Sequence, residues 1–140
     1  MKAYTIDELE IGQKASFAKT VTETDVYMFA GITGDINPIH INQEYAKNSI
    51  FKDRIAHGML SAGFISAVIG VQLPGPGSIY SGQTLKFLAP VYIGDTITAT
   101  VEVAEIIAEK GRVILKTTCV NQDGKTVLDG EATIVLKGDK

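Results

Sequence analysis

The sequence predicts an α+β domain in which an antiparallel sheet curls around one long buried helix. From Gly58 to about Gln72 the residues are apolar or small nearly all round, with Ser61 and Ser66 the interruptions. A helix that is apolar on every side is expected to be buried on every side. Four β-rich runs follow it and supply the sheet. The 140 residues show no repeat, linker or low-complexity segment, so one domain over 1–140 is expected.

The first third of the chain predicts one strand and one helix before the long helix. Alternating residues predict the strand, and Thr22 to Asp25 supply residues that begin helices. Gly31 and Gly34 are expected to end that helix. The expected elements are a strand over 13–21, a helix from about 23 with Val26, Phe29 and Ala30 at helical spacing, a loop over 35–40, a helical turn over 43–47 and a polar connection over 51–54.

The second half of the chain predicts four strands. Turn residues separate the β-rich runs, and the Asp123-Gly124 pair is a strong hairpin signal. The small residues of the long helix are expected to let strands approach it closely; they are Ala62, Gly63, Ala67 and Gly70. The expected strands are Ser78–Phe87, Thr96–Ile107, Arg112–Asn121 and Thr126–Lys137.

Composition argues against several classes of function. The formal net charge is −3 without a Lys/Arg cluster, which argues against nucleic acid as a partner. The longest apolar run falls short of the ~20 residues of a membrane helix, and the first residues do not resemble a signal peptide. The single cysteine, Cys119, excludes an intrachain disulfide and is expected to be a buried, inert thiol. A cytoplasmic protein that contacts neither membrane nor nucleic acid is therefore expected.

An acid and an imidazole, Asp35 and His40, lie five residues apart across the turn Asn37-Pro38. Proline fixes its own φ angle and biases Asn37 toward extended backbone, so the turn can direct both side chains toward one point. A water held between them would allow general acid–base catalysis. The alternative is that these are ordinary turn residues with His40 hydrogen-bonded at the edge of a loop.

Four residues at the start of the long helix or within it are candidates for a structural or a functional role. Gly58 either permits a tight entry into the helix or exposes free backbone N–H groups to a developing oxyanion. Ser61 and Ser66 face different sides of the helix, so at most one can point at the acid and imidazole. His57 is expected to be structural, bonding a backbone carbonyl near the helix entry. The two histidines are far apart in sequence, so no metal site is expected.

Four segments resemble the R-specific enoyl-CoA hydratases, or MaoC-like dehydratases, and together they span most of the chain. They are FAGITGDINPIH at 29–40, RIAHGML at 54–60, LPGPGSIY at 73–80 and FLAPV at 87–91. The resemblance implies a hot-dog fold with about five strands around a central helix. It also implies a homodimer with thioester sites near the subunit boundary. The single-domain length resembles that of the short bacterial enzymes that supply (R)-3-hydroxyacyl-CoA for polyhydroxyalkanoate synthesis.

The resemblance also implies roles for individual residues. By position in the motifs, Asp35 and His40 take the catalytic roles and Gly58 the backbone oxyanion contact. Ser66, rather than Ser61, takes the supporting hydroxyl position near the acid, and Asn37 is grouped with the substrate-binding residues. The implied reaction is hydration of a trans-2-enoyl-CoA to an (R)-3-hydroxyacyl-CoA, or the reverse. It requires no cofactor, because water addition involves no net redox change.

Other functions remain open at this point. The substrate carrier is either coenzyme A or acyl carrier protein, and the cations Lys52, Arg54 and Lys86 are isolated candidates for contacting it. A hot-dog thioesterase is disfavoured, because residues 56–73 contain no Asp or Glu that would activate water at the thioester carbon. A non-catalytic acyl-binding module is disfavoured by the intact pair of Asp35 and His40.

Overall fold

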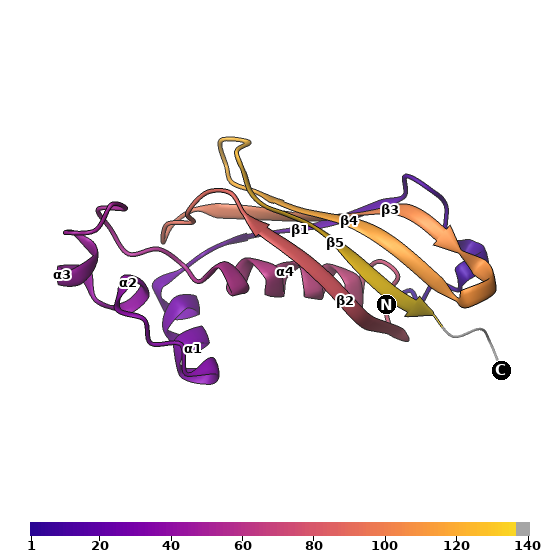
Figure 1. The fold of residues 1–140 in the computed structure, drawn as a ribbon, viewed down its shortest axis with the longest axis horizontal. Helices are drawn as coiled ribbons and strands as arrows, with labels where there is room; N and C mark the ends of the chain where they lie inside the picture. Colours follow the sequence, from indigo (N-terminus) through magenta and orange to yellow (C-terminus); the bar gives the residue numbers. More distant parts are fainter. Residues whose placement is uncertain (137–140) are drawn as a thin grey trace.

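A five-stranded antiparallel sheet forms the larger layer of the computed structural model, which describes residues 1–136 (Figure 1). The strand order is β1-β3-β4-β5-β2, so the strand that follows the long helix lies at one edge and the N-terminal strand at the other. The five predicted strands are confirmed within a residue at each end, and Lys137 lies outside the described residues. The strands are β1 (Lys14–Thr20), β2 (Ser78–Phe87), β3 (Thr96–Ile107), β4 (Arg112–Val120) and β5 (Thr126–Leu136).

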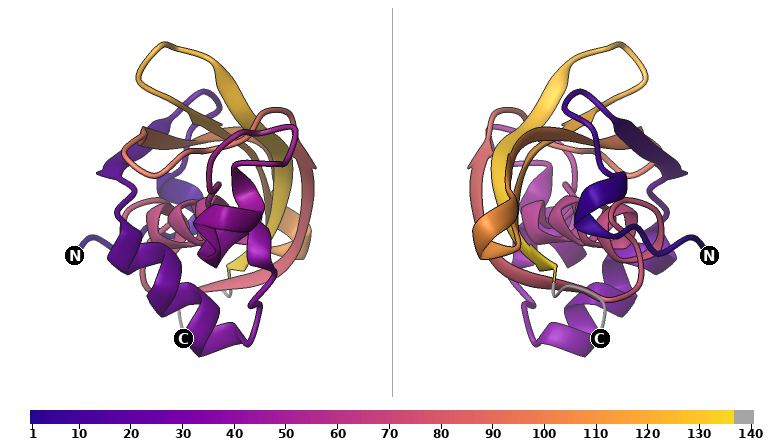
Figure 2. Two further views of the ribbon diagram at one scale, coloured as in Figure 1. Left: turned by 90° about the vertical axis from the view of Figure 1, so that its left-hand side faces the viewer. Right: turned by 90° about the vertical axis from the view of Figure 1, so that its right-hand side faces the viewer.

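Helix α4 (Gly58–Val71) lies against the concave face of this sheet, which curls over it in the end-on views (Figure 2). Alternate residues of β3 and β4 are fully buried, as expected for strands with one face on a core. They meet one face of the helix, whose buried apolar residues are Phe64, Ile65, Val68 and Ile69. The expected α+β class and the hot-dog arrangement are therefore confirmed.

The opposite face of α4 is exposed, which corrects the expectation of a helix buried all round. Gly63, Ala67 and Gly70 lie on this face, whereas Ala62 packs against the core. A Cβ atom at Gly63 or Gly70 would meet nothing within 4 Å among the described residues. No strand of the chain's own sheet therefore packs against these two glycines, contrary to expectation. The physical reason is that one curled sheet covers a single side of the helix in one chain.

Helix α1 (Glu23–Thr33) begins at a capping box in which the Thr22 hydroxyl accepts from the Asp25 N–H and the Asp25 carboxylate accepts from the Thr22 N–H. The helix continues through Gly31, contrary to expectation, and ends at Gly34. Gly34 takes φ +81°, a left-handed conformation that glycine adopts without steric cost.

Two one-turn helices, α2 (Pro38–Ile41) and α3 (Gln43–Ala46), follow and lie with α1 near the start of α4 (Figure 1). A loop was expected over 35–40, but its second half is the helical turn α2. Asn37 caps it by accepting a hydrogen bond from the Ile39 N–H at 3.3 Å, and Pro38 stands at the first helical position. The expected helical turn over 43–47 corresponds to α3.

The remaining elements are the short 3₁₀ turns η1 (Ile6–Glu8) and η2 (Ala108–Lys110). Cys119 is fully buried, and burial raises the pKa of its thiol to about 12, which confirms an inert thiol. Within residues 1–136, none of the helices has the length and apolar character required to cross a bilayer.

Candidate active site

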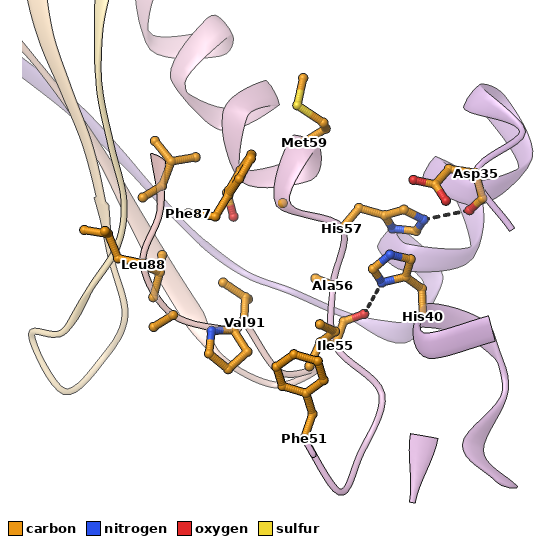
Figure 3. A pocket seen from close by; sticks show the side chains of 16 residues that line it. Asp35, His40, Phe51, Ile55, Ala56, His57, Met59, Phe87, Leu88 and Val91 are labelled. Carbon is orange, nitrogen blue, oxygen red and sulfur yellow. Dashed lines mark hydrogen bonds between the residues drawn. The ribbon is translucent and has the colours of Figure 1, made fainter. Parts of the chain in front are cut away.

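Asp35 and His40 line one cavity of about 440 Å³ at the start of α4 (Figure 3). Asp35 follows the left-handed turn at Gly34, and His40 lies on α2. A carboxylate oxygen of Asp35 and a ring nitrogen of each histidine, His40 and His57, all lie within 4.8 Å of one another. The turn at Asn37-Pro38 therefore does direct the acid and the imidazole toward one point.

The ring of His40 is held in one orientation and one tautomer. Its Nδ1 lies 2.7 Å from the Ile55 carbonyl oxygen, and since a carbonyl can only accept, Nδ1 carries the hydrogen. The backbone of Ile55 is itself fixed, because its N–H donates to the Ile39 carbonyl and it bridges to Tyr92. Nε2 of His40 is therefore left with a free lone pair, which can accept a proton.

The charge state of His40 is set mainly by its burial. The side chain is largely buried, and desolvation lowers its pKa below the ordinary value of 6.5. The Ile55 carbonyl and the Asp35 carboxylate raise the pKa, and His57 lowers it further, but desolvation is the largest cause. The ring is consequently neutral at pH 7, as a general base must be.

Asp35 presents an exposed carboxylate, whereas Asn37 has a structural task. The Asp35 carboxylate accepts a 3.4 Å hydrogen bond from the Asn37 N–H, and the Asp35 N–H donates to the Thr33 hydroxyl. The Asn37 side chain caps α2, and Asn37 does not line the cavity. The geometry thus accounts for Asn37 through the backbone turn, and its grouping with the substrate-binding residues stays a prediction.

Gly58 is the first residue of α4 and lines the same cavity. The first N–H groups of a helix have no partners inside it, and the His57 side chain caps none of them. A Cβ atom at Gly58 would lie 2.6 Å from the Phe87 ring, so the glycine also lets this ring lie against the helix start. Both interpretations of Gly58, a close packing contact and an exposed amide, are compatible with this geometry.

The two serines of α4 lie on different sides, as the helical spacing requires. Ser61 is 2% exposed and lines the cavity, whereas Ser66 is exposed on the opposite face. Within one chain, therefore, Ser61 and not Ser66 lies beside the candidate site. The hydroxyl position that the resemblance gives to Ser66 is not reached by the Ser66 of the same chain.

His57 is the site residue that sequence reasoning undervalued. The predicted bond to a backbone carbonyl is confirmed, because its Nε2 lies 2.9 Å from the Asp35 carbonyl oxygen. What was missed is that its ring stacks on His40, with centroids 3.8 Å apart and planes at 25°. A separation of 17 residues gives no signal of this contact, which depends on how α2 packs against the start of α4.

The distances alone would allow Asp35, His40 and His57 to hold a metal ion. The two histidines are distant in sequence but adjacent in the fold, so their separation in sequence was not a valid reason to expect no metal site. However, imidazole lone pairs lie in the ring plane, so two stacked rings do not direct both lone pairs at one ion. Nδ1 of His40 and Nε2 of His57 are also engaged by carbonyl oxygens. The geometry favours packed rings over coordination.

Arg54, a candidate for contacting the substrate carrier, is already engaged. Its guanidinium donates to Glu23 at 2.5 Å, to the Tyr27 hydroxyl at 2.6 Å and to Gln43 at 3.0 Å. These bonds tie the segment before Ile55 to α1 and α3, and so support the carbonyl that orients His40.

The rest of the cavity wall is apolar. Apolar side chains in a concave site with a few polar groups at one end suit a ligand with a hydrocarbon part and one reacting end. These residues include Phe51, Met59, Phe87, Leu88, Val91 and Leu128 (Figure 3).

Comparisons with known proteins identify the family of this chain. Residues 7–126 match the family model described as MaoC like domain. An (R)-specific enoyl-CoA hydratase from Rhodospirillum rubrum is 57% identical over 93% of this chain and 90% of its own. A mitochondrial 3-hydroxyacyl-[acyl-carrier-protein] dehydratase from Solanum lycopersicum is 42% identical, over 91% of this chain and 78% of its own. The solved structure of the R-hydratase PhaJ1 from Pseudomonas aeruginosa superposes with a TM-score of 0.91 at 48% identity, covering 96% of this chain and 86% of that one. This chain therefore belongs to the MaoC-like dehydratase family.

Proposed function

We propose that this protein hydrates trans-2-enoyl-CoA to (R)-3-hydroxyacyl-CoA and catalyses the reverse dehydration. The observation that carries the proposal is that the Asp35 carboxylate and a ring nitrogen of His40 lie within 4.8 Å of each other in the wall of an apolar cavity that also contains Gly58, and that the bond from Nδ1 to Ile55 leaves the His40 Nε2 as the proton acceptor. The Rhodospirillum rubrum hydratase, 57% identical, supports the same reaction.

The geometry supports a one-water mechanism. A water molecule between Asp35 and His40 gives one proton to Nε2 of His40 while its oxygen forms a bond to C3 of the substrate. The electrons of the C2=C3 bond move onto the thioester, whose oxygen is stabilised by the free backbone N–H at Gly58. The imidazolium then returns the proton to C2, which completes the addition of one water. Asp35 accepts a hydrogen bond from the second hydrogen of the water, which stays on the oxygen as the new hydroxyl, and its negative charge stabilises the transient imidazolium.

Substitutions at the two polar groups test the assignment. Asp35→Asn and His40→Gln are each expected to lower the turnover number for crotonyl-CoA hydration at least a hundredfold, because the first removes the carboxylate charge and the second removes the proton acceptor. The loss of absorbance of the conjugated enoyl bond measures the rate, and circular dichroism verifies that the variants fold. Near-normal hydration by either folded variant would contradict the mechanism.

Acyl carrier protein is the alternative carrier of the acyl chain. The relative from Solanum lycopersicum supports this alternative, because its name gives acyl carrier protein as the carrier of its substrate. The two carriers are separated by comparing kcat/KM for the same acyl chain on coenzyme A and on acyl carrier protein. Release of free thiol without loss of the enoyl bond would instead indicate a thioesterase. No turnover of either kind would indicate a binding module.

We also propose that two copies pair through the exposed face of α4. This face carries small residues, and it contains Ser66 eight positions after Gly58, about 12 Å along the helix. Because Ser66 is exposed and does not line the cavity of its own chain, a second copy is the remaining source of a Ser66 hydroxyl for the site. We also propose that the enzyme acts in the cytoplasm on an acyl-CoA.

A further inference from the structure

We propose that His57 is a positioning residue that aligns the Asp35 turn with the His40 ring. The inference rests on the proposed function, because it assigns a task to His57 within that site. His57 is 2% exposed, immediately precedes Gly58 and lines the same cavity. It therefore stands where the acid, the imidazole and the helix start meet (Figure 3).

His57 provides a long-range anchor for the backbone of Asp35. The Asp35 carbonyl can only accept, so Nε2 of His57 carries the hydrogen and donates across 2.9 Å. The hydrogen bonds that Asp35 makes with Thr33 and Asn37 are local ones within the turn. The bond from His57 instead links this turn to α4, a rigid element packed on the sheet. It thereby fixes the backbone position from which the Asp35 side chain extends.

His57 also limits the movement of His40. The two rings stack at 3.8 Å, while the His40 Nδ1–H is held by the Ile55 carbonyl. One ring face and one edge of His40 are thus fixed, which leaves Nε2 aimed in one direction. On the α1 side, Phe29 packs against His57 with ring centroids 4.7 Å apart, so His57 cannot easily turn away.

The chemistry of His57 argues that its N–H, and not only its bulk, is used. Its Nδ1 is buried and meets no hydrogen-bond partner within residues 1–136, and leaving a buried polar group unpaired is unfavourable. A phenylalanine would fill nearly the same space without that cost. What histidine adds is the donor at Nε2, which reaches the Asp35 carbonyl.

A matched set of variants separates the N–H from the ring. His57→Phe keeps a stacking ring and loses the donor, whereas His57→Gln places an amide N–H near the position of Nε2. We expect His57→Phe to lower kcat for enoyl-CoA hydration at least tenfold with KM changed less than about threefold, because substrate contacts remain. His57→Gln is expected to recover most of that loss.

The pH profile provides a readout that a purely structural role would not change. The titratable groups that face His57 are Asp35 and His40. In His57→Ala the His40 ring loses its cover, so the acidic limb of kcat/KM is expected to move to higher pH. A variant that merely contains less folded enzyme would show a lower plateau and an unmoved limb. If the alanine variant does not fold, the phenylalanine and glutamine variants carry the test alone.

The outcomes separate this inference from the proposed function. Wild-type protein without hydratase activity would overturn the proposed function. An active wild type, inactive Asp35→Asn and His40→Gln, and a normal His57→Phe would overturn the role of His57 alone. A glutamine variant no more active than the phenylalanine variant would also overturn it, because the donor would then be irrelevant.

Discussion

His40 shows how a single hydrogen bond decides which atom does the chemistry. The Ile55 carbonyl holds Nδ1–H, so proton transfer is confined to Nε2. The stiff turn at Asn37-Pro38 is a local feature, so the sequence allowed a meeting of Asp35 and His40 as one of two interpretations, and the family resemblance favoured it. The sequence did not predict the stacking of His57, because that contact depends on the packing of α2 against α4.

The lowered pKa of His40 predicts how activity depends on pH. Burial places the pKa of its ring below 6.5, so the ring stays neutral at pH 7 and loses its proton-accepting capacity only when the pH falls through the lowered pKa. The acidic limb of kcat/KM, measured on the free enzyme with crotonyl-CoA from pH 4.5 to 8 (about the range where imidazole titrates), is expected to have its midpoint below 6.5. A midpoint above 6.5 would show that the ring is solvated or paired differently.

At the scale of elements, alternation and turn residues were sufficient to predict every strand. The strand runs are bounded by glycine-containing turns, and these are local signals. The apolar character of α4 predicted its length but not its exposed face, because that face depends on how far one sheet can curl. The helical turn α2 was missed because it is one turn long and depends on the cap from Asn37.

Gly130 shows that close strand pairing can require a glycine. It lies on β5 opposite Leu85, and a Cβ atom there would overlap the Thr84 carbonyl oxygen of β2. Gly130→Ala is therefore expected to lower the free energy of unfolding by about 1–3 kcal/mol, as overpacking against rigid backbone does. Urea unfolding measures the change.

Gly82 on the partner strand is the matched control for this test. A Cβ atom at Gly82 would lie 3.9 Å from the Thr133 Cβ, which is ordinary contact. Gly82→Ala is therefore expected to change stability by less than about 1 kcal/mol. Equal effects of the two substitutions would show that the loss does not come from the contact with Thr84.

At the scale of the whole molecule, one chain leaves part of its structure uncovered. The exposed face of α4 ends in partly exposed apolar side chains, Met59 at 53% and Val71 at 48%. Ser66 lies between them on a face that the chain's own sheet does not reach. A second copy with the same face would cover both helices, since twofold interfaces pair a patch with itself.

Mixing two variants that are each impaired tests whether Ser66 acts across such an interface. We expect Ser66→Ala to lower kcat and, when unfolded and refolded together with Asp35→Asn, to regain activity. In a mixed dimer, the Asp35 of the serine variant and the Ser66 of the aspartate variant would form one intact site. With random pairing, about half of the dimers are mixed and each has one intact site, so about a quarter of wild-type activity should return.

The same experiment distinguishes the other arrangements of Ser66. If Ser66 served the site of its own chain, both sites of a mixed dimer would lack one group and no activity would return. If Ser66→Ala alone were fully active, the hydroxyl would have no part in the reaction. Sedimentation velocity on the mixture verifies that dimers have formed. Recovery that follows the fraction of mixed dimers would therefore establish both the pairing through α4 and the sharing of the site between two copies.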